Sequence, residues 1–240
     1  MIPKKIHYCW FGQEKLPVLV RKCIDSWRKF LPDYEIIKWS EDNFDVYSNR
    51  YVREAYENRK FAFVSDYVRL HALYYNGGIY MDSDVEVLKS LDPFLVHEAF
   101  AGFESHQHIA TSIIASVKNH RFIGELLSAY KERCFVEPDG LFDTTTNVKV
   151  ITDSILRYGL KLDGTKQTVN GLTLYPPEYF CPYDYITGKK SITENSYCIH
   201  WFLKTWVDPK LILRSRVTRI FHRIFGKNCF AVLKKILGEQ

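Results

Sequence analysis

The chain has 240 residues, a formal net charge of +5 and a globular composition, with 46% hydrophobic and 25% charged residues. This length predicts one sizeable domain or one domain with an appendage, and the composition excludes general disorder. No run approaches the 18 apolar residues of a membrane span, no apolar signal sequence follows Met1, and six cysteines form no CxxC pair. These features favour a cytoplasmic protein with reduced thiols.

The first segments predict a β-α-β unit. A short aromatic strand from Ile6 to Gly12 is followed by a helical pattern from Leu16 to Phe30 and a second strand from Tyr34 to Trp39. This order is typical of nucleotide-binding α/β folds, in which ligands bind at the carboxyl ends of the strands. Trp10 lies at such an end, although without further context a tryptophan in this pattern is more typical of a buried core.

The segment from Phe61 to Asn76 predicts one helix, which ends where Gly77-Gly78 supplies a left-handed cap. At 100° per residue, Ser65, Asp66 and Arg69 share one side, while most of the remaining surface is apolar. We therefore expect Asp66 and Arg69 to touch at i,i+3 and to be buried or to line a cleft. A purely structural ion pair is the alternative.

The apolar strand Gly78–Met81 leads directly into Asp82-Ser83-Asp84. Alternation along a strand predicts that Asp82 and Asp84 point to the same side. Two converging carboxylates are costly without a positive partner, so the pattern favours a divalent cation such as Mn²⁺ or Mg²⁺. Two unrelated surface aspartates are the alternative. An aspartyl-phosphate-type phosphatase also uses a DxD after a strand, but usually as an early first motif.

The stretch from Ser65 to Val87, SDYVRLHALYYNGGIYMDSDVEV, closely resembles the sugar-binding DxD region of glycosyltransferase family 32. It is more distantly similar to the catalytic domain of the clostridial glucosylating toxins. The resemblance implies a single-domain glycosyltransferase A-type α/β fold, Rossmann-like, with a mixed central sheet. It also implies metal-dependent sugar transfer, with retention, from a nucleoside-diphosphate sugar to a hydroxyl of a glycan or lipid-linked oligosaccharide. The expected setting is surface polysaccharide biosynthesis (capsule or lipopolysaccharide), and a UDP-sugar is favoured over a GDP-sugar.

The resemblance also suggests roles for individual residues. Asp84 is expected to hold the metal, with Asp82 and His200 as further ligands, and Trp10 to stack on the nucleobase. The expected catalytic residues are Asp66, Arg69, Asp82 and Asp84, and the expected donor-binding residues are Trp10, Ser65, Asp66, Arg69, Tyr80, Asp82 and Trp206. A protein that binds sugar or membrane without turnover is the alternative.

Later segments add a strand pair at 100–103 and 111–115, around a polar loop that contains His106 and His108. Lone loop histidines are more often solvated than catalytic. Helices are expected at 122–133 and 148–158. The second follows residues 144–147, where family members carry a loop that faces donor and acceptor.

The C-terminal part predicts a basic amphipathic helix. We divide the chain into a catalytic domain, residues 1–209, and a tail, residues 210–240. Residues 211–240 hold seven Lys or Arg and only one acid, Glu239, so they carry +6. This pattern favours peripheral contact through residues 211–237 with the anionic inner face of the cytoplasmic membrane. Packing of the helix on the catalytic domain is the alternative, and no nucleic acid is expected.

Overall fold

The computed structural model describes residues 1–203, 209–226 and 229, and gives only the backbone of residues 209–214, 216 and 217. The described helices are α1 (Val18–Phe30), α2 (Arg50–Glu57), α3 (Phe61–Asn76), α4 (Arg121–Ser128), α5 (Asn147–Leu156), α6 (Pro177–Phe180) and α7 (Pro209–Phe225), with a 3-10 turn η1 at Asp92–Phe94. The described strands are β1 (Lys5–Cys9), β2 (Glu35–Trp39), β3 (Gly78–Met81), β4 (Val85–Val87), β5 (Ala99–Ser105), β6 (His108–Ser116), β7 (Gln167–Val169), β8 (Leu172–Tyr175), β9 (Tyr183–Asp184), β10 (Lys189–Lys190) and β11 (Cys198–His200).

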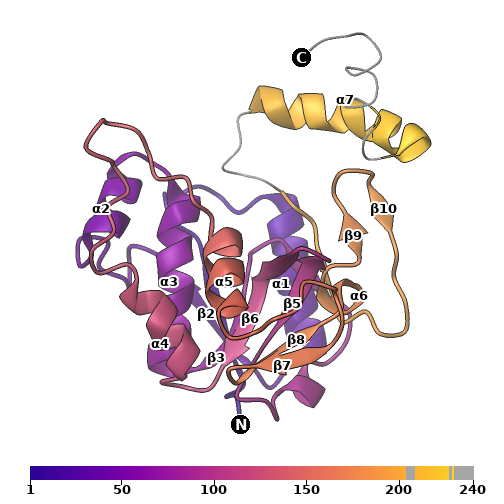
Figure 1. Ribbon diagram of the computed structural model, residues 1–240, viewed down its shortest axis with the longest axis horizontal. Coiled ribbons are helices and arrows are strands. Elements are labelled where there is room, and N and C mark those ends of the chain that lie inside the picture. Colours follow the sequence, from indigo (N-terminus) through magenta and orange to yellow (C-terminus); the bar gives the residue numbers. More distant parts are fainter. Residues whose placement is uncertain (204–208, 227–228, 230–240) are drawn as a thin grey trace.

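The central sheet is mixed, as expected, with seven strands in the order β2-β1-β3-β6-β5-β8-β7. Strand β1 runs parallel to both β2 and β3, which confirms the predicted β-α-β unit, whereas β6 is antiparallel to β3 and β5. Helices cover both faces of the sheet (Figure 1). The carboxyl ends of β2, β1 and β3 therefore meet at one edge.

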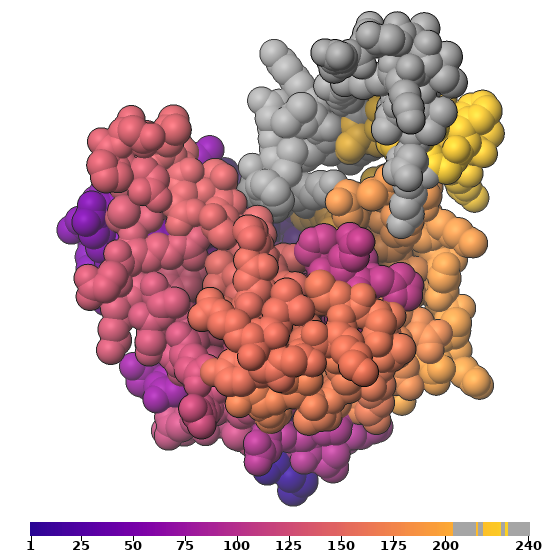
Figure 2. Space-filling model, viewed as in Figure 1, coloured from indigo at the N-terminus to yellow at the C-terminus, as the bar shows by residue number. Residues whose placement is uncertain are grey.

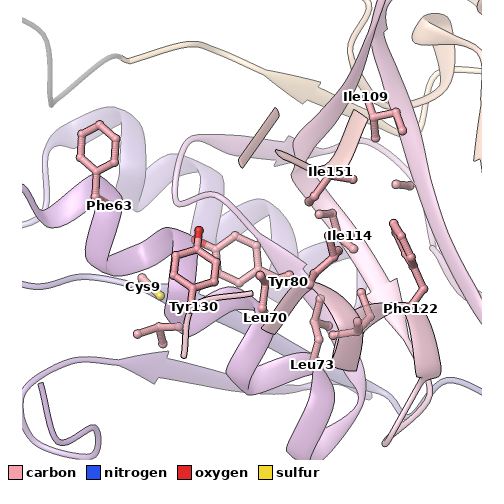
Figure 3. Packing of buried hydrophobic residues seen from close by; sticks show 14 of the residues in the cluster. Cys9, Phe63, Leu70, Leu73, Tyr80, Ile109, Ile114, Phe122, Tyr130 and Ile151 are labelled. Carbon is pink, nitrogen blue, oxygen red and sulfur yellow. The ribbon is translucent and has the colours of Figure 1, made fainter. Parts of the chain in front are cut away.

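Two hydrophobic cores lie on opposite faces of this sheet, because side chains alternate along each strand. Tyr80 of β3 belongs to the core beneath helices α2 to α5, while its neighbours Ile79 and Met81 belong to the core beneath α1. Figure 3 shows Leu70 and Leu73 of α3 packed near Tyr80 and Ile114 in the first core. With both faces covered, ligands have access to the sheet at its edges.

Two glycines and a histidine fix the start of β3. Helix α3 ends at Asn76, as predicted, and Gly77 and Gly78 have φ of 65° and 115°. A Cβ atom on Gly78 would lie 2.8 Å from the Lys5 carbonyl, so only glycine lets β3 approach β1 this closely. Buried His7 receives the Trp39 indole N–H at Nδ1, at 3.1 Å, so its Nε2 donates to the Gly77 carbonyl at 2.9 Å.

Two expected helix boundaries were wrong. Helix α1 begins at Val18, with Pro17 as its N-cap residue, and α4 ends at Ser128 rather than at Arg133. The Arg133 guanidinium instead donates to the Asp143 carboxylate and the Thr145 carbonyl. These contacts join the two ends of the 131–146 segment to each other, while the Phe135 and Val136 N–H groups donate to Glu54 of α2.

Candidate active site

The DxD motif forms a turn between β3 and β4. The strand ends at Met81, and the Val85 N–H donates to the Asp82 carbonyl at 3.0 Å to close the turn. The prediction that strand alternation orients Asp82 and Asp84 was therefore wrong. Their carboxylates converge all the same, because the turn folds both toward the carboxyl edge of the sheet.

His200 joins the two aspartates. Strand β11 pairs with β4, and His200 lies opposite Val85 in the register. His200 Nε2 lies 3.4 Å from Asp84 Oδ1 and 4.0 Å from Asp82 Oδ2, and one ligand atom of each residue lies within 4.8 Å of the others. Sequence reasoning thus selected three residues that the fold brings together.

The segment after β11 wraps around Asp84. The Leu203 N–H donates to Asp84 Oδ2 at 2.6 Å, and the Trp201 N–H donates to the Asp84 carbonyl at 3.1 Å. Phe202, between them, has a φ of 52°, which is unusual for a bulky residue, and its ring centre lies 3.9 Å from that of His200. The reversal of the chain at Phe202 lets neighbouring residues contact Asp84 from two directions.

The charges of this cluster are mutually stabilising. Burial opposes charge on both groups, but the His200 imidazolium lowers the pKa of Asp84, and the Asp84 carboxylate raises the pKa of His200 well above its usual value. Two carboxylates and one imidazole are suitable ligands for Mn²⁺ or Mg²⁺, and a dication balances the two negative charges once His200 is neutral. The donor set therefore fits a divalent metal.

A second polar cluster lies on α3 beside the DxD turn. Arg69 contacts Asp66 at 3.0 Å and Asp82 at 3.4 Å, and its Nη1 donates to the Thr111 carbonyl at 2.7 Å. The predicted i,i+3 contact is confirmed, and both side chains are buried. The Arg69 guanidinium also lies over the Tyr80 ring, 4.6 Å from its centre. Tyr80 is almost completely buried and supports Arg69; its own contact with a donor stays a prediction.

Asp66 is held at its other side by the first residue of α5. The backbone N–H of Asn147 donates to Asp66 Oδ2 at 3.3 Å, and the side-chain amide of Asn147 donates to the backbone carbonyl of Asp66 at 2.7 Å. Burial raises the pKa of Asp66 to about 6, against the opposing effect of Arg69. Sequence reasoning placed Asn147 in a loop facing donor and acceptor but missed its contact with Asp66, because the two residues are 81 positions apart.

The other expected site residues have different surroundings. Trp10 follows β1 at the same edge, and its indole N–H donates to the Glu14 carbonyl at 2.7 Å. Ser65 donates back to the Phe61 carbonyl at 3.0 Å. Trp206 lies outside the described residues. His106 and His108 flank the exposed turn between β5 and β6, so the structure does not add them to the acidic cluster.

Helix α7 lies beside the β9–β10 hairpin (Figure 1). The Arg219 guanidinium lies 5.9 Å from the centre of the Tyr183 ring, while Ile220, Ile224 and Phe225 are exposed. The side chains of Leu213 and Val217, two of the apolar residues of this helix, lie outside the described part of the chain. None of the described helices is both long and apolar enough to cross a bilayer.

Comparison with known proteins identifies residues 17–101 as a glycosyltransferase sugar-binding region containing a DXD motif. Inositol phosphoceramide mannosyltransferase 3 of Schizosaccharomyces pombe is 31% identical over 133 residues, which cover 51% of this chain and 35% of that protein. An uncharacterized glycosyltransferase of Acanthamoeba polyphaga mimivirus is 26% identical and is covered to 84%, with 86% of this chain. The solved structure of the PaToxG glycosyltransferase shares the fold, with a TM-score of 0.50 and 20% identity over 65% of this chain and 69% of that one.

The chain has the glycosyltransferase A-type fold, and its DXD site lies in the region that resembles glycosyltransferases. The chain is similar to the DXD-containing glycosyltransferases through this region and through its relatives. It spans about a third of the length of the fungal relatives that it matches. Of the alternatives that the sequence left open, these similarities favour an enzyme that transfers sugar.

Proposed function

We propose that the chain transfers a sugar from a nucleoside-diphosphate sugar to a hydroxyl of a glycan or lipid-linked oligosaccharide, with Asp82, Asp84 and His200 holding Mn²⁺ or Mg²⁺. The observation that carries this proposal is the convergence of these three residues beside the buried Asp66–Arg69 pair. When bound, the metal supplies positive charge that holds the diphosphate and stabilises the leaving nucleoside diphosphate.

The protein's own groups orient the donor sugar. Asp66 accepts hydrogen bonds from sugar hydroxyls, and Arg69 donates to the sugar or the diphosphate while it keeps Asp66 and Asp82 at fixed positions. Because Arg69 and Asn147 already hold the Asp66 carboxylate, we assign it to orientation rather than to nucleophilic attack. Retention would then follow from attack by the acceptor hydroxyl on the face that the leaving group departs from.

The acceptor is proposed to be attached to a membrane. The S. pombe relative is named an inositol phosphoceramide mannosyltransferase, and an acceptor of that general kind carries a lipid. On α7 the exposed Ile220, Ile224 and Phe225 accompany Arg219 and Arg223, a combination suited to an anionic surface. We therefore propose peripheral contact at the inner face of the cytoplasmic membrane and a role in surface polysaccharide synthesis, such as capsule or lipopolysaccharide.

Hydrolysis of nucleoside-diphosphate sugars by the purified full chain tests the enzymatic proposal. We expect slow release of free sugar with Mn²⁺ or Mg²⁺, loss of release with a chelator, and a further increase in turnover when an acceptor glycan is added. Equal rates with and without metal would overturn the metal assignment. Accumulation of a phosphorylated enzyme would overturn sugar transfer as the reaction.

A further inference from the structure

The two ring nitrogens of His200 have different surroundings. Its Nε2 faces the carboxylates of Asp84 and Asp82, at 3.4 Å and 4.0 Å. Its Nδ1 is buried, and no hydrogen bond of normal geometry reaches it from the part of the chain that the structure describes. A buried polar atom without a partner costs free energy, so the neighbours of Nδ1 decide whether this histidine can be held in one orientation.

The Cys181 thiol is the side chain that meets this imidazole from the interior. Its hydrogen-bonding contact with the ring contributes to the raised pKa of His200, after the larger effects of burial and of Asp84. An imidazole has only two nitrogens that form hydrogen bonds, and Nε2 is directed at the carboxylates. The contact with Cys181 is therefore assigned to Nδ1. Sulfur is a weak acceptor, which fits a contact outside the normal hydrogen-bond geometry.

Helix α6 holds the thiol at this position. Cys181 is the residue that ends α6, its N–H donates to the Pro177 carbonyl at 2.8 Å, and it is only 5% exposed. The chain that enters β11 is joined to the same helix, because the Tyr197 N–H donates to the Tyr179 carbonyl at 2.7 Å. Backbone hydrogen bonds thus fix the separation between the element that carries the thiol and the strand that ends at His200.

Phe202 limits the rotation of the imidazole. The centres of the two rings are 3.9 Å apart and their planes are inclined by 35°. Phe202 is held in turn by the Tyr185 ring, whose centre lies 4.8 Å from its own. With one face of the imidazole covered, the ring has little freedom to turn its Nδ1 away from Cys181.

Cys181 is not itself a member of the acidic cluster. Among the described residues, the group that could hold a metal consists of Asp82, Asp84 and His200. Burial raises the pKa of the Cys181 thiol, against the opposing effect of His200, so the thiol remains protonated. A neutral thiol is a poor ligand for Mn²⁺ or Mg²⁺, which prefer oxygen and nitrogen. Any effect of Cys181 on the metal site must therefore act through His200.

A histidine that binds a metal through Nε2 carries its proton on Nδ1, and such ligands almost always donate that proton to an acceptor. We propose that Cys181 is the positioning residue of His200: its sulfur accepts from Nδ1–H, which fixes the tautomer and keeps Nε2 directed at Asp82 and Asp84. This role rests on the metal site of the proposed function and adds a residue that touches neither the metal nor the sugar donor.

The first test is the affinity of the full chain for Mn²⁺, measured by calorimetry without donor. Cys181→Ala is expected to weaken Mn²⁺ binding about tenfold, because Nδ1–H loses its acceptor. Cys181→Ser is expected to stay within about threefold of the wild type, since a hydroxyl also accepts. Cys23→Ala is the matched control, because Cys23 is equally buried on α1 and has the same thiol removed. We expect this control to bind Mn²⁺ like the wild type.

Two further measurements separate positioning from other roles. Long-range ¹H–¹⁵N spectra of the wild type with saturating Mg²⁺ need no variant, and we expect them to show the His200 proton on Nδ1. Cd²⁺ binding tests whether the sulfur is itself a ligand, because soft ions favour thiolates. We expect Cys181→Ser to change the affinities for Cd²⁺ and Mn²⁺ by the same small factor.

Three results would overturn the inference: wild-type Mn²⁺ affinity in Cys181→Ala, a proton on Nε2 in the Mg²⁺-bound wild type, or a loss in Cys181→Ser that is confined to Cd²⁺. In each of these cases the wild type binds the ion, so the metal site of the proposed function stands. If the wild type binds neither Mn²⁺ nor Mg²⁺, both the positioning role and the proposed metal site fail.

Discussion

The guanidinium of Arg69 lies 3.4 Å from Oδ1 of Asp82, so one ion pair joins the polar face of α3 to the DxD turn. The same guanidinium contacts Asp66 at 3.0 Å and is almost completely buried. A group shared in this way fixes the distance between the expected sugar-binding and metal-binding halves of the donor site. Changes to either half are therefore expected to affect the other.

Asp84→Asn is expected to abolish metal-dependent activity while preserving the fold. The amide oxygen can still accept from the Leu203 N–H, but the negative charge opposite His200 is lost. We expect kcat/KM to fall at least about 100-fold and Mn²⁺ affinity, measured by calorimetry without donor, to fall at least about tenfold. Asp25→Asn on the exposed side of α1 is the control. Wild-type Mn²⁺ affinity in Asp84→Asn would exclude Asp84 as a ligand.

Arg69→Lys is expected to be more damaging than a change from one cation to another suggests. Lysine has no planar fork and cannot contact Asp66, Asp82 and the Thr111 carbonyl at once. We expect a loss of about 3 kcal/mol in the free energy of unfolding, measured by urea denaturation, because a buried carboxylate loses its partner. Activity should fall along with stability. Exposed Arg28→Lys provides the comparison, and equal stability of the two variants would contradict the coupling.

Asp66→Asn is expected to stabilise the protein at neutral pH although it lowers activity. The pKa of Asp66 is raised to about 6, so wild-type stability contains a cost of ionising this buried carboxylate that grows as pH rises through the window between about 4 and 6. Each pKa unit corresponds to about 1.4 kcal/mol, and the lost Arg69 contact reduces the gain. Thermal melts of both proteins at pH 5 and 7.5 measure the effect. If the melting temperatures of the wild type and Asp66→Asn differ by the same amount at both pH values, ionisation of Asp66 does not cause the difference.

Asn147→Ala is expected to lower kcat with little change in metal affinity. Asn147 touches Asp66 through its amide but has no contact with Asp82 or Asp84. The Tyr130 hydroxyl donates to the Asn147 side chain at 2.8 Å, so Tyr130→Phe should reproduce part of the effect by removing that support. Steady-state kinetics and Mn²⁺ calorimetry separate the two quantities. A matching loss of Mn²⁺ affinity would show that Asn147 acts on the metal site instead.

Charged substitutions on α7 test membrane contact. The 131–146 segment and α7 lie on opposite sides of the upper part of the molecule in Figure 2, so α7 can be altered without touching Asp66 or its partners. Ile224→Asp and Phe225→Asp are expected to reduce sedimentation with anionic liposomes at least about fivefold. Each substitution removes exposed apolar surface and lowers the net positive charge of the helix. Val96→Asp, at an equally exposed site elsewhere, should have no effect. Undiminished binding by the α7 variants would overturn the membrane proposal.

The helix and the strand that lead to the DxD motif could be predicted because the sequence patterns that determine them are local. The apolar helix Phe61–Asn76, the Gly77-Gly78 stop and the strand Gly78–Met81 lie within consecutive residues, and the structure confirms each of them. Helical periodicity also placed Asp66 against Arg69. The sequence wrongly predicted that strand alternation orients the two aspartates of the DxD motif. Two aspartates separated by one residue occur in turns as well as in strands, so the spacing does not distinguish the two.

The sequence by itself determined the fold class, the α3–β3 unit and the residues that form the acidic cluster, since local periodicity, glycine conformation and carboxylate chemistry act over short distances. Only the tertiary structure decided which of these residues share partners. His200 reaches Asp84 because β11 pairs with β4. Asn147 lies at the start of α5, where it contacts both Asp66 and Tyr130. Glu41 reaches Gly12 because β1 and β2 are parallel neighbours. Pairings of this kind depend on packing across the whole domain, which no local pattern encodes.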